Sequence, residues 1–144
     1  MAKADSGASR HYIRTQDTPV LNNVQPTSNG PLVNLPNNST IKAEHIGHLP
    51  FDSTQISPTA TKAYALPGLA SASLLSLGQL CDDNCKVILD QHKLQLYKDD
   101  KIILQGHRNV IDGLWDIPIK NYFITQSIEA HKNYFNTQQT EVNQ

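Results

Sequence analysis

A short run of small residues follows Asp5, and this stretch could do hydrolytic chemistry. Asp5 supplies a carboxylate that can take up and release a proton, and the Ser6 hydroxyl can hydrogen-bond within the turn. Gly7 permits a tight backbone conformation, and Ala8 is small enough for a second copy of the loop to pack against the first. Two such carboxylates can act together as general acid and general base. The alternative interpretation is an ordinary surface turn, because the triplet Asp-Ser-Gly has low specificity.

The composition limits what kind of molecule must hold this stretch. The chain has 144 residues, the length of one domain, with 38% hydrophobic and only 17% charged residues. A surface that relies on uncharged polar residues favours a β-rich domain with polar loops over a helical bundle. The formal net charge is -1 and no basic stripe occurs, which predicts no direct contact with nucleic acid. No apolar run approaches the length of a membrane span and no signal-peptide core occurs, so we expect no membrane contact and a cytoplasmic location.

The cysteines do not predict a disulfide framework or a metal centre. Cys81 and Cys85 are the two cysteines of the chain, which favours a reducing setting. With His92 they could suggest zinc, but the spacing is not that of a structural zinc site. We interpret both as buried or idle thiols, and we expect no metal and no organic cofactor.

Local patterns predict mostly strands. Strands are expected around Tyr12 and at residues 32–35, 62–66, 87–89, 94–104 and 114–119. The segment at 94–104 reads as a hairpin that turns at residues 98–101. Pro118 predicts that the last strand lies at an edge of the sheet. Residues 1–4 make a poor strand, which indicates that the chain begins inside a larger protein.

One helix is expected, at residues 69–80, where leucines recur at helical spacing after a run of small residues. Ser71 or Ser73 could cap it. Residues 1–119 are therefore predicted to form a small β-barrel or half-barrel with one short helix. Residues 120–144 turn polar and rich in Asn and Gln, and we expect a tail or a linker there.

Three motifs in order resemble the protease region of copia-type retrotransposon polyproteins. Residues 5–12 read Asp-Ser-Gly-Ala-Ser-Arg-His-Tyr, similar to the family's Asp-Ser-Gly-Ala followed within a few residues by His. Residues 66–80 run from Leu-Pro-Gly-Leu into Leu-Leu-Ser-Leu-Gly-Gln-Leu, similar to its second hallmark. Residues 113–117, Gly-Leu-Trp-Asp-Ile, resemble the Gly-Leu-Tyr/Trp segment that closes the domain.

The resemblance implies a retropepsin-like, mostly β fold and an aspartic endopeptidase that processes its own polyprotein. Asp5 would be the catalytic carboxylate, and Ser6, Gly7 and Ala8 would support the active loop. An aspartic protease needs two carboxylates, and this sequence has one Asp-Ser/Thr-Gly triplet. The resemblance therefore implies a homodimer with peptide substrates, in the family context of a cytoplasmic virus-like particle.

Two further site assignments follow from family position. The flap over the substrate would lie at about 37–51, with Gly47 between Ile46 and His48 as its flexible point. An ordinary hairpin with exposed histidines is the alternative there. Leu69, Ala70 and Ser71 would pack beneath the active loop, with Ser71 in place of a family glycine.

The competing interpretation of the whole chain is not enzymatic. It describes a truncated, catalytically inactive β-barrel relic with a structural or interaction role, supported by the poor strand before Asp5 and by Ser71. In either case we expect His11 to be structural or exposed and Trp115 to pack under the barrel.

Overall fold

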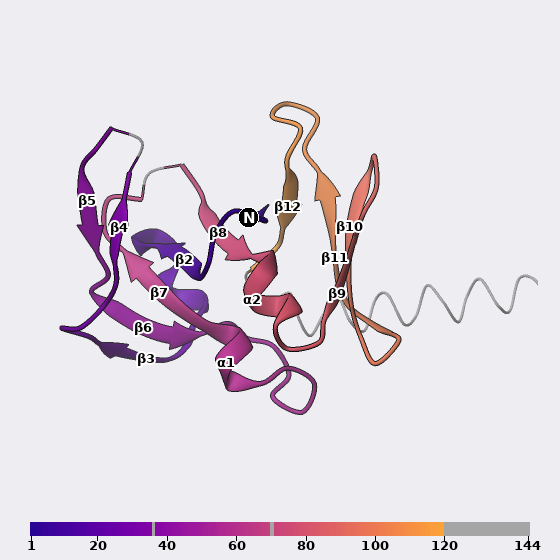
Figure 1. The fold of residues 1–144 in the computed structure, drawn as a ribbon, viewed down its shortest axis with the longest axis horizontal. Coiled ribbons are helices and arrows are strands. Elements are labelled where there is room, and N and C mark those ends of the chain that lie inside the picture. The colour runs from indigo at the N-terminus through magenta and orange to yellow at the C-terminus, as the bar shows by residue number, and fades with distance from the viewer. Residues whose placement is uncertain (36, 70, 120–144) are drawn as a thin grey trace, which may run out of the picture.

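The computed structural model describes residues 1–35, 37–69 and 71–119, and in that part the protein is mostly β, as the composition predicted (Figure 1). The strands are β1 (Ala2–Asp5), β2 (His11–Arg14), β3 (Asn22–Pro26), β4 (Leu32–Asn34), β5 (Thr40–Lys42), β6 (His45–His48), β7 (Lys62–Leu66), β8 (Ser73–Ser76), β9 (Lys86–Leu89), β10 (Lys93–Lys98), β11 (Lys101–Arg108) and β12 (Trp115–Ile117). The helices are α1 (Pro58–Thr61), α2 (Leu77–Cys81) and the 3-10 helix η1 (Thr15–Val20).

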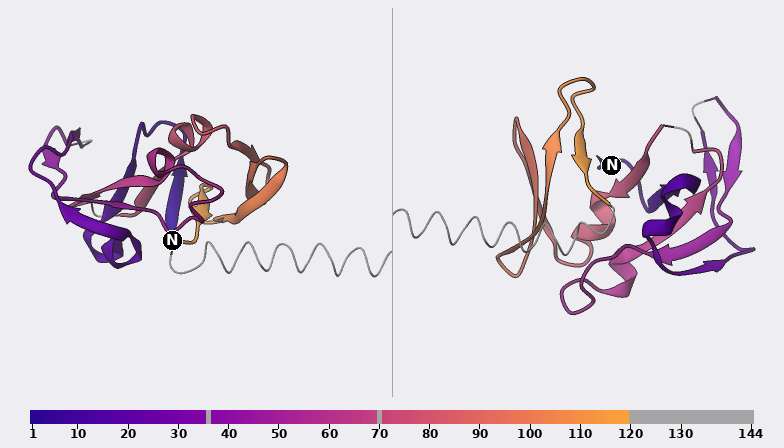
Figure 2. Two further views of the ribbon diagram at one scale, coloured as in Figure 1. Left: turned by 90° about the horizontal axis from the view of Figure 1, so that it is seen from below. Right: turned by 180° about the vertical axis from the view of Figure 1, so that it is seen from behind.

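Ten of the strands form one sheet in the order β3-β6-β7-β2-β8-β1-β12-β11-β10-β9. The sheet is open, with β3 and β9 as its edges, so the expected barrel does not close. β4 and β5 form a separate two-stranded hairpin. Figure 2 shows that this hairpin stands at the opposite end of the molecule from β9 and β10.

β1 lies at the centre of this arrangement. It pairs in parallel with β8 and antiparallel with β12, and Asp5 is opposite Ser76 in the β8 register. The expectation that residues 1–4 make a poor strand was therefore wrong. Ala2 is fully buried, and its small side chain fits where β1 packs against the core.

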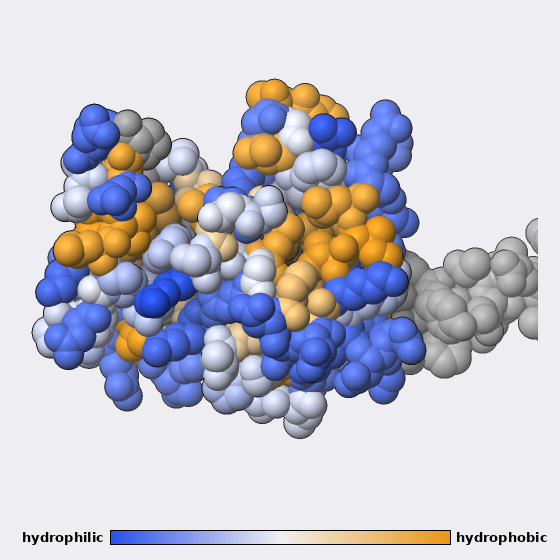
Figure 3. Space-filling view, viewed as in Figure 1, coloured by the Kyte–Doolittle hydropathy of each residue, from blue (hydrophilic) through white to orange (hydrophobic). Residues whose placement is uncertain are grey.

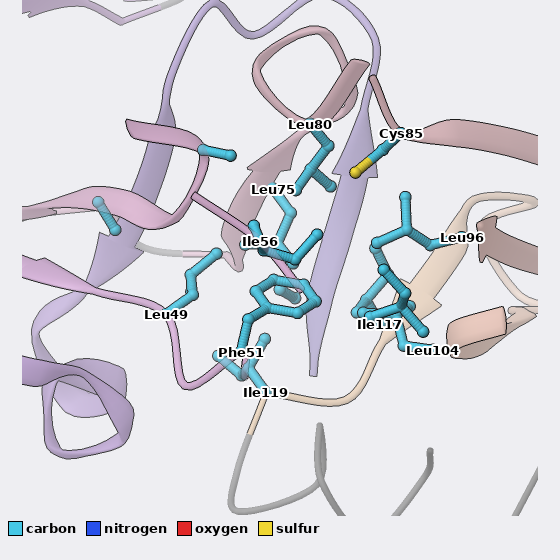
Figure 4. Packing of buried hydrophobic residues seen from close by; sticks show 14 of the residues in the cluster. Leu49, Phe51, Ile56, Leu75, Leu80, Cys85, Leu96, Leu104, Ile117 and Ile119 are labelled. Atoms are coloured by element: carbon cyan, nitrogen blue, oxygen red, sulfur yellow. The ribbon is translucent and has the colours of Figure 1, made fainter. Parts of the chain in front are cut away.

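The core collects buried side chains from both halves of the sheet (Figure 4). In β2 the buried positions alternate with partly exposed ones, as expected from the two-residue period of a strand. β1 is buried only at Ala2, and in β8 both Leu75 and Ser76 are buried. Ile13 and Leu75 are fully buried on this inner face, and Leu96 and Leu104 meet them from the β10–β11 hairpin. The opposite face of β1, β2 and β8 faces outward, and Asp5 lies on it.

The helix predicted at 69–80 is wrong over most of its length. Residues 73–76 form β8, which inserts between β1 and β2, and only Leu77–Cys81 are helical. The cap is Ser76, whose hydroxyl accepts a hydrogen bond from the Gln79 amide at 3.0 Å, rather than Ser71 or Ser73. Pairing on both sides of β8 outweighs the local helix preference of this leucine-rich run.

Several strand predictions are confirmed, but the predicted edge position of the last strand was wrong. The chain reverses between β10 and β11 at Asp99 and Asp100, whose φ angles of 51° and 62° suit a two-residue hairpin turn. β12 is not an edge strand, because it pairs with β1 and β11, and Pro118 follows after the strand has ended.

The predicted tail at 120–144 lies outside the described residues. None of the described helices is long and apolar enough to cross a membrane.

Gly106 in β11 allows a close approach of the β12 backbone. A Cβ on this residue would overlap the carbonyl oxygen of Asp116 and lie 3.2 Å from its carbonyl carbon. We expect Gly106→Ala to lower the free energy of unfolding by about 1–3 kcal/mol, because the backbone of β12 must shift. Urea denaturation followed by circular dichroism would measure the change.

Gly78 in α2 offers the matched control, because a Cβ there would meet Ser76 Oγ at an ordinary 3.8 Å. Gly78→Ala should be neutral or stabilise by up to about 1 kcal/mol, because alanine favours the helix. Equal losses in the two variants would contradict this explanation of the close approach between β11 and β12.

Candidate active site

The backbone of its own loop holds the Asp5 carboxylate. Asp5 Oδ1 accepts hydrogen bonds from the amides of Gly7 at 2.7 Å and Ala8 at 3.2 Å. A Cβ on Gly7 would lie only 3.3 Å from the same oxygen, so a glycine suits this close turn. Within the described residues Oδ2 makes no hydrogen bond, and the side chain is half-buried at the end of β1. One oxygen is thus fixed, while the other is available to an incoming group.

Ser76 anchors the Asp5 loop to the neighbouring strand. Its hydroxyl donates a hydrogen bond of 2.6 Å to the carbonyl oxygen of Ala8 and accepts one from the Gln79 amide. The Ser76 side chain is fully buried, so both contacts are shielded from water. The same residue therefore ends β8, begins α2 and holds the loop that follows Asp5.

His11 lies behind this anchor and is also fully buried. Its Nδ1 accepts a hydrogen bond of 2.9 Å from the Ser76 amide, and its Nε2 donates one of 2.7 Å to the carbonyl oxygen of Ala60. Because an amide only donates and a carbonyl only accepts, these two partners require the neutral ring with its proton on Nε2. Burial lowers the pKa of His11 to about 4, although the bond to Ala60 opposes the shift. His11 is therefore structural, one of the two roles expected for it.

Gln79 completes the network from the first turn of α2. Its side-chain oxygen accepts from the His11 amide at 3.0 Å, and its nitrogen donates to the carbonyl oxygens of Thr59 at 2.9 Å and Lys62 at 2.8 Å. The spacing Ser-x-x-Gln in the sequence is that of a capping box, which could have located the helix start. Here the glutamine reaches other segments, and His11 takes its place on the Ser76 amide.

The predicted flap residues are part of the large sheet. Ile46, Gly47 and His48 belong to β6, which is paired with β3 on one side and β7 on the other. Gly47 is buried, and a Cβ there would lie 3.0 Å from the Cβ of Leu21. A strand paired on both edges does not project as a flap does, so Ile46, Gly47 and His48 do not lie at the tip of a flap. The range predicted for the flap, 37–51, also includes β5, and the β4–β5 hairpin does project (Figure 1).

The residues predicted beneath the active loop lie elsewhere. Leu69 and Ser71 are in the connection from β7 to β8, where the Ser71 carbonyl accepts from Arg14 Nη1 at 3.5 Å, and Ala70 is outside the described residues. Ser76 is the residue opposite Asp5. Ser71 is therefore not the residue that packs beside Asp5.

A charged contact holds β1 at the edge that pairs with β12. The Lys3 ammonium pairs with Asp112, at 2.6 Å, and with Asp116. Burial lowers the pKa of Lys3, but the hydrogen bonds to the two carboxylates outweigh it and leave the pKa raised. This contact ties β1 to the loop at 109–114. Figure 3 shows that this loop and the β4–β5 hairpin project from the same side, with a hollow between them.

The remaining candidates do not belong to this site. Cys81 is exposed, and Cys85 is buried with its pKa raised to about 11, chiefly by burial, so Cys85 suits a structural thiol. In the ranges that the structure describes, no group of three His, Cys, Asp or Glu side chains could hold a metal ion. Trp115 is partly buried and packs against the core. The guanidinium carbon of Arg108 lies 4.7 Å from the centre of its ring, and its Nε1 donates to the Asp90 carbonyl.

Comparisons with known proteins give no further assignment. No family model, no curated protein and no solved structure matches the chain. The functional interpretation therefore depends on the motifs and on the geometry around Asp5.

The buried His11 predicts that the fold weakens in acid. The unfolded chain takes up a proton near pH 6.5, whereas the folded protein does so only near pH 4. Stability should thus be greatest above pH 6.5 and fall by roughly 3 kcal/mol as the pH drops to 4. Urea midpoints measured across this range would show the loss.

Two variants identify the titrating group. His11→Gln should be less stable near neutral pH by about 2 kcal/mol, since it cannot reach both partners, and its pH profile should be flatter. His107→Gln, at an exposed position of β11, is the control and should keep the slope of the unaltered protein. A slope that survives in His11→Gln would assign the acid sensitivity to other groups.

Proposed function

We propose that the protein is an aspartic endopeptidase of a copia-type retrotransposon polyprotein, active as a homodimer. The observation that carries the proposal is the Asp5 carboxylate, fixed through one oxygen by the amides of Gly7 and Ala8 at the end of a central strand. The resemblance of residues 5–12 and 66–80 to that family supports the same activity. The sheet is open and Asp5 lies at the end of one of its central strands. This arrangement suits a subunit that supplies half of an active site on a two-fold axis.

Two other aspartates that adjoin a Ser or a Gly offer no equivalent loop. Asp52 accepts hydrogen bonds from the amide and hydroxyl of Thr54 in an exposed turn, and Asp112 is paired with Lys3. A second carboxylate beside Asp5 would therefore come from another copy of the chain. A two-fold contact supplies it from the same residue, because such an interface presents the same surface on both subunits.

The chemistry of the pair follows from charge. Two carboxylates held close cannot both ionise at low cost, so they share one proton, as the paired aspartates of aspartic proteases do. The ionised partner removes a proton from a water molecule, which attacks the peptide carbonyl. The protonated partner stabilises the developing oxyanion and then helps to protonate the leaving nitrogen. Ser6 is exposed, its hydroxyl makes no hydrogen bond within the described residues, and it is not a nucleophile in this scheme.

The substrate would be an extended peptide from the polyprotein itself. The hollow between the β4–β5 hairpin and the loop at 109–114 is open to a peptide in an extended conformation (Figure 3). The setting would be the cytoplasmic particle in which polyproteins of this kind are processed.

The competing function is an interaction module without catalysis. Val110 and Ile111 favour it, because their side chains are 97% and 92% exposed at the tip of a projecting loop. Exposed apolar side chains of this size are frequent at protein–protein contacts. The two functions differ in whether Asp5 is required.

We expect Asp5→Asn to abolish cleavage of a fluorescein-labelled unfolded protein at mildly acidic pH, with at least a ~100-fold loss of rate. Its unfolding midpoint should stay close to that of the unaltered protein, because asparagine keeps the oxygen that accepts from Gly7. The rate of peptide release and the urea midpoint are the two measurements.

Mixing the two proteins tests the dyad directly. If every active site needs two Asp5 carboxylates, the rate after subunit exchange should fall with the square of the fraction of unaltered chains. A linear fall would mean that each chain acts alone. Equal rates in Asp5→Asn and the unaltered protein, or a strict monomer by sizing at micromolar concentration, would remove the protease interpretation.

A further inference from the structure

We infer that Arg10, Lys62 and Tyr64 form a subsite for the carboxylate of an acidic side chain in the bound peptide. The inference deepens the proposed function, on which it rests, by naming a chemical preference of the substrate. It concerns a residue of the peptide some distance from the bond that is cleaved.

The three side chains form one cluster on the outward face of β2 and β7. The guanidinium carbon of Arg10 lies 5.4 Å from the centre of the Tyr64 ring, and the Lys62 ammonium lies 5.7 Å from it. Arg10 Nη1 also donates a hydrogen bond of 3.3 Å to the Tyr64 hydroxyl. The half-buried ring thus orients two cations that would otherwise be mobile.

The strand register places this cluster on the same face as Asp5. Lys3 is opposite Leu74 in the pairing of β1 with β8, Leu74 is opposite Tyr12, and Tyr12 is opposite Tyr64. Side chains of paired residues share a face, and so do residues two apart, which adds Asp5 to this row. Asp5 and Tyr64 are therefore on one side of the sheet.

The separation suits an extended peptide. β1 and β7 are three strands apart in the order β7-β2-β8-β1, or roughly 14 Å at the usual spacing of neighbouring strands. An extended chain covers about 3.4 Å per residue. A peptide that crosses the sheet from Asp5 would thus bring its fourth residue or so to the cluster.

The charges of Arg10 and Lys62 lack a carboxylate among the described residues. By contrast, Lys3, Arg14 and Lys98 each form a salt bridge with an aspartate. Two exposed cations that converge on one ring would repel each other less with an anion between them. A carboxylate fits because the guanidinium can donate two parallel hydrogen bonds to it.

The surroundings of the cluster favour a peptide over a nucleic acid. Tyr12, Ile46 and Leu74 are partly exposed beside it and offer apolar contacts to side chains. The chain as a whole carries a formal charge of -1, which does not attract a polyanion. Single-stranded RNA is the second ligand to compare in the experiment.

Binding to the Asp5→Asn protein tests the subsite without relying on cleavage. The probes are two capped pentapeptides, Thr-Val-Glu-Val-Thr and Thr-Val-Gln-Val-Thr, titrated against the isotope-labelled full chain and followed by NMR. We expect the glutamate peptide to bind about fivefold more tightly, with shifts at Arg10, Lys62 and Tyr64. Salt at roughly 1 M should remove the difference.

Variants in the Asp5→Asn background separate the cluster from general surface charge. The double variant Arg10→Met, Lys62→Met should bind both peptides equally. Lys86→Met, at an exposed lysine of edge strand β9, removes a charge elsewhere and should keep the preference. Urea midpoints would confirm that each variant is folded.

The outcomes distinguish this inference from the proposed function. Equal binding of the two peptides, a preference that survives in the double variant, or tighter binding of oligouridine than of the glutamate peptide would overturn the subsite. A glutamate preference lost only in the double variant supports the subsite, whether or not the unaltered protein cleaves peptides. Cleavage without any such preference would leave the protease and refute the subsite.

Discussion

The two hydrogen bonds of the buried His11 ring are the contacts on which the candidate site depends. Its ring accepts from the Ser76 amide and donates to the Ala60 carbonyl, so that two backbone groups removed from water both find partners. Ser76 is thereby fixed in place to hold the carbonyl of Ala8. Without the ring, the buried Ser76 amide would lose its partner at a cost of about 1–3 kcal/mol, whereas the Ala60 carbonyl would keep the bond of 3.3 Å from Gln79 Nε2.

This arrangement sets two requirements against each other. In the proposed dimer, a carboxylate pair that shares a proton would work best in mild acid, whereas the His11 ring must stay neutral to accept from the Ser76 amide. The low pKa of His11, about 4, leaves an interval of pH in which both conditions hold. The buried position of the histidine therefore matters for the proposed function as well as for folding.

The sequence predicted the fold class and most of the strands. It failed where pairing between distant segments decides the structure. The leucines of residues 69–80 recur at helical spacing, yet residues 73–76 form β8 between β1 and β2. A local sequence pattern does not predict pairing with strands that are distant in the chain. The flap was placed at 37–51 by family position, with Gly47 as its flexible point, but this glycine serves close packing against Leu21. The support from His11 and Gln79 depends on side chains that meet only after folding.

The open sheet has two unlike edges. β3 is interrupted by a register shift between Asn22 and Gln25, with Asn23 at a φ of 53°, and it ends at Pro26, which has no amide hydrogen to offer. β9 is a regular strand, and within the described residues its exposed Ile88 and Leu89 have no bulge or proline beside them. At high concentration, strand-to-strand aggregation of this domain would therefore begin along β9, and a storage buffer or fusion partner should shield that edge first.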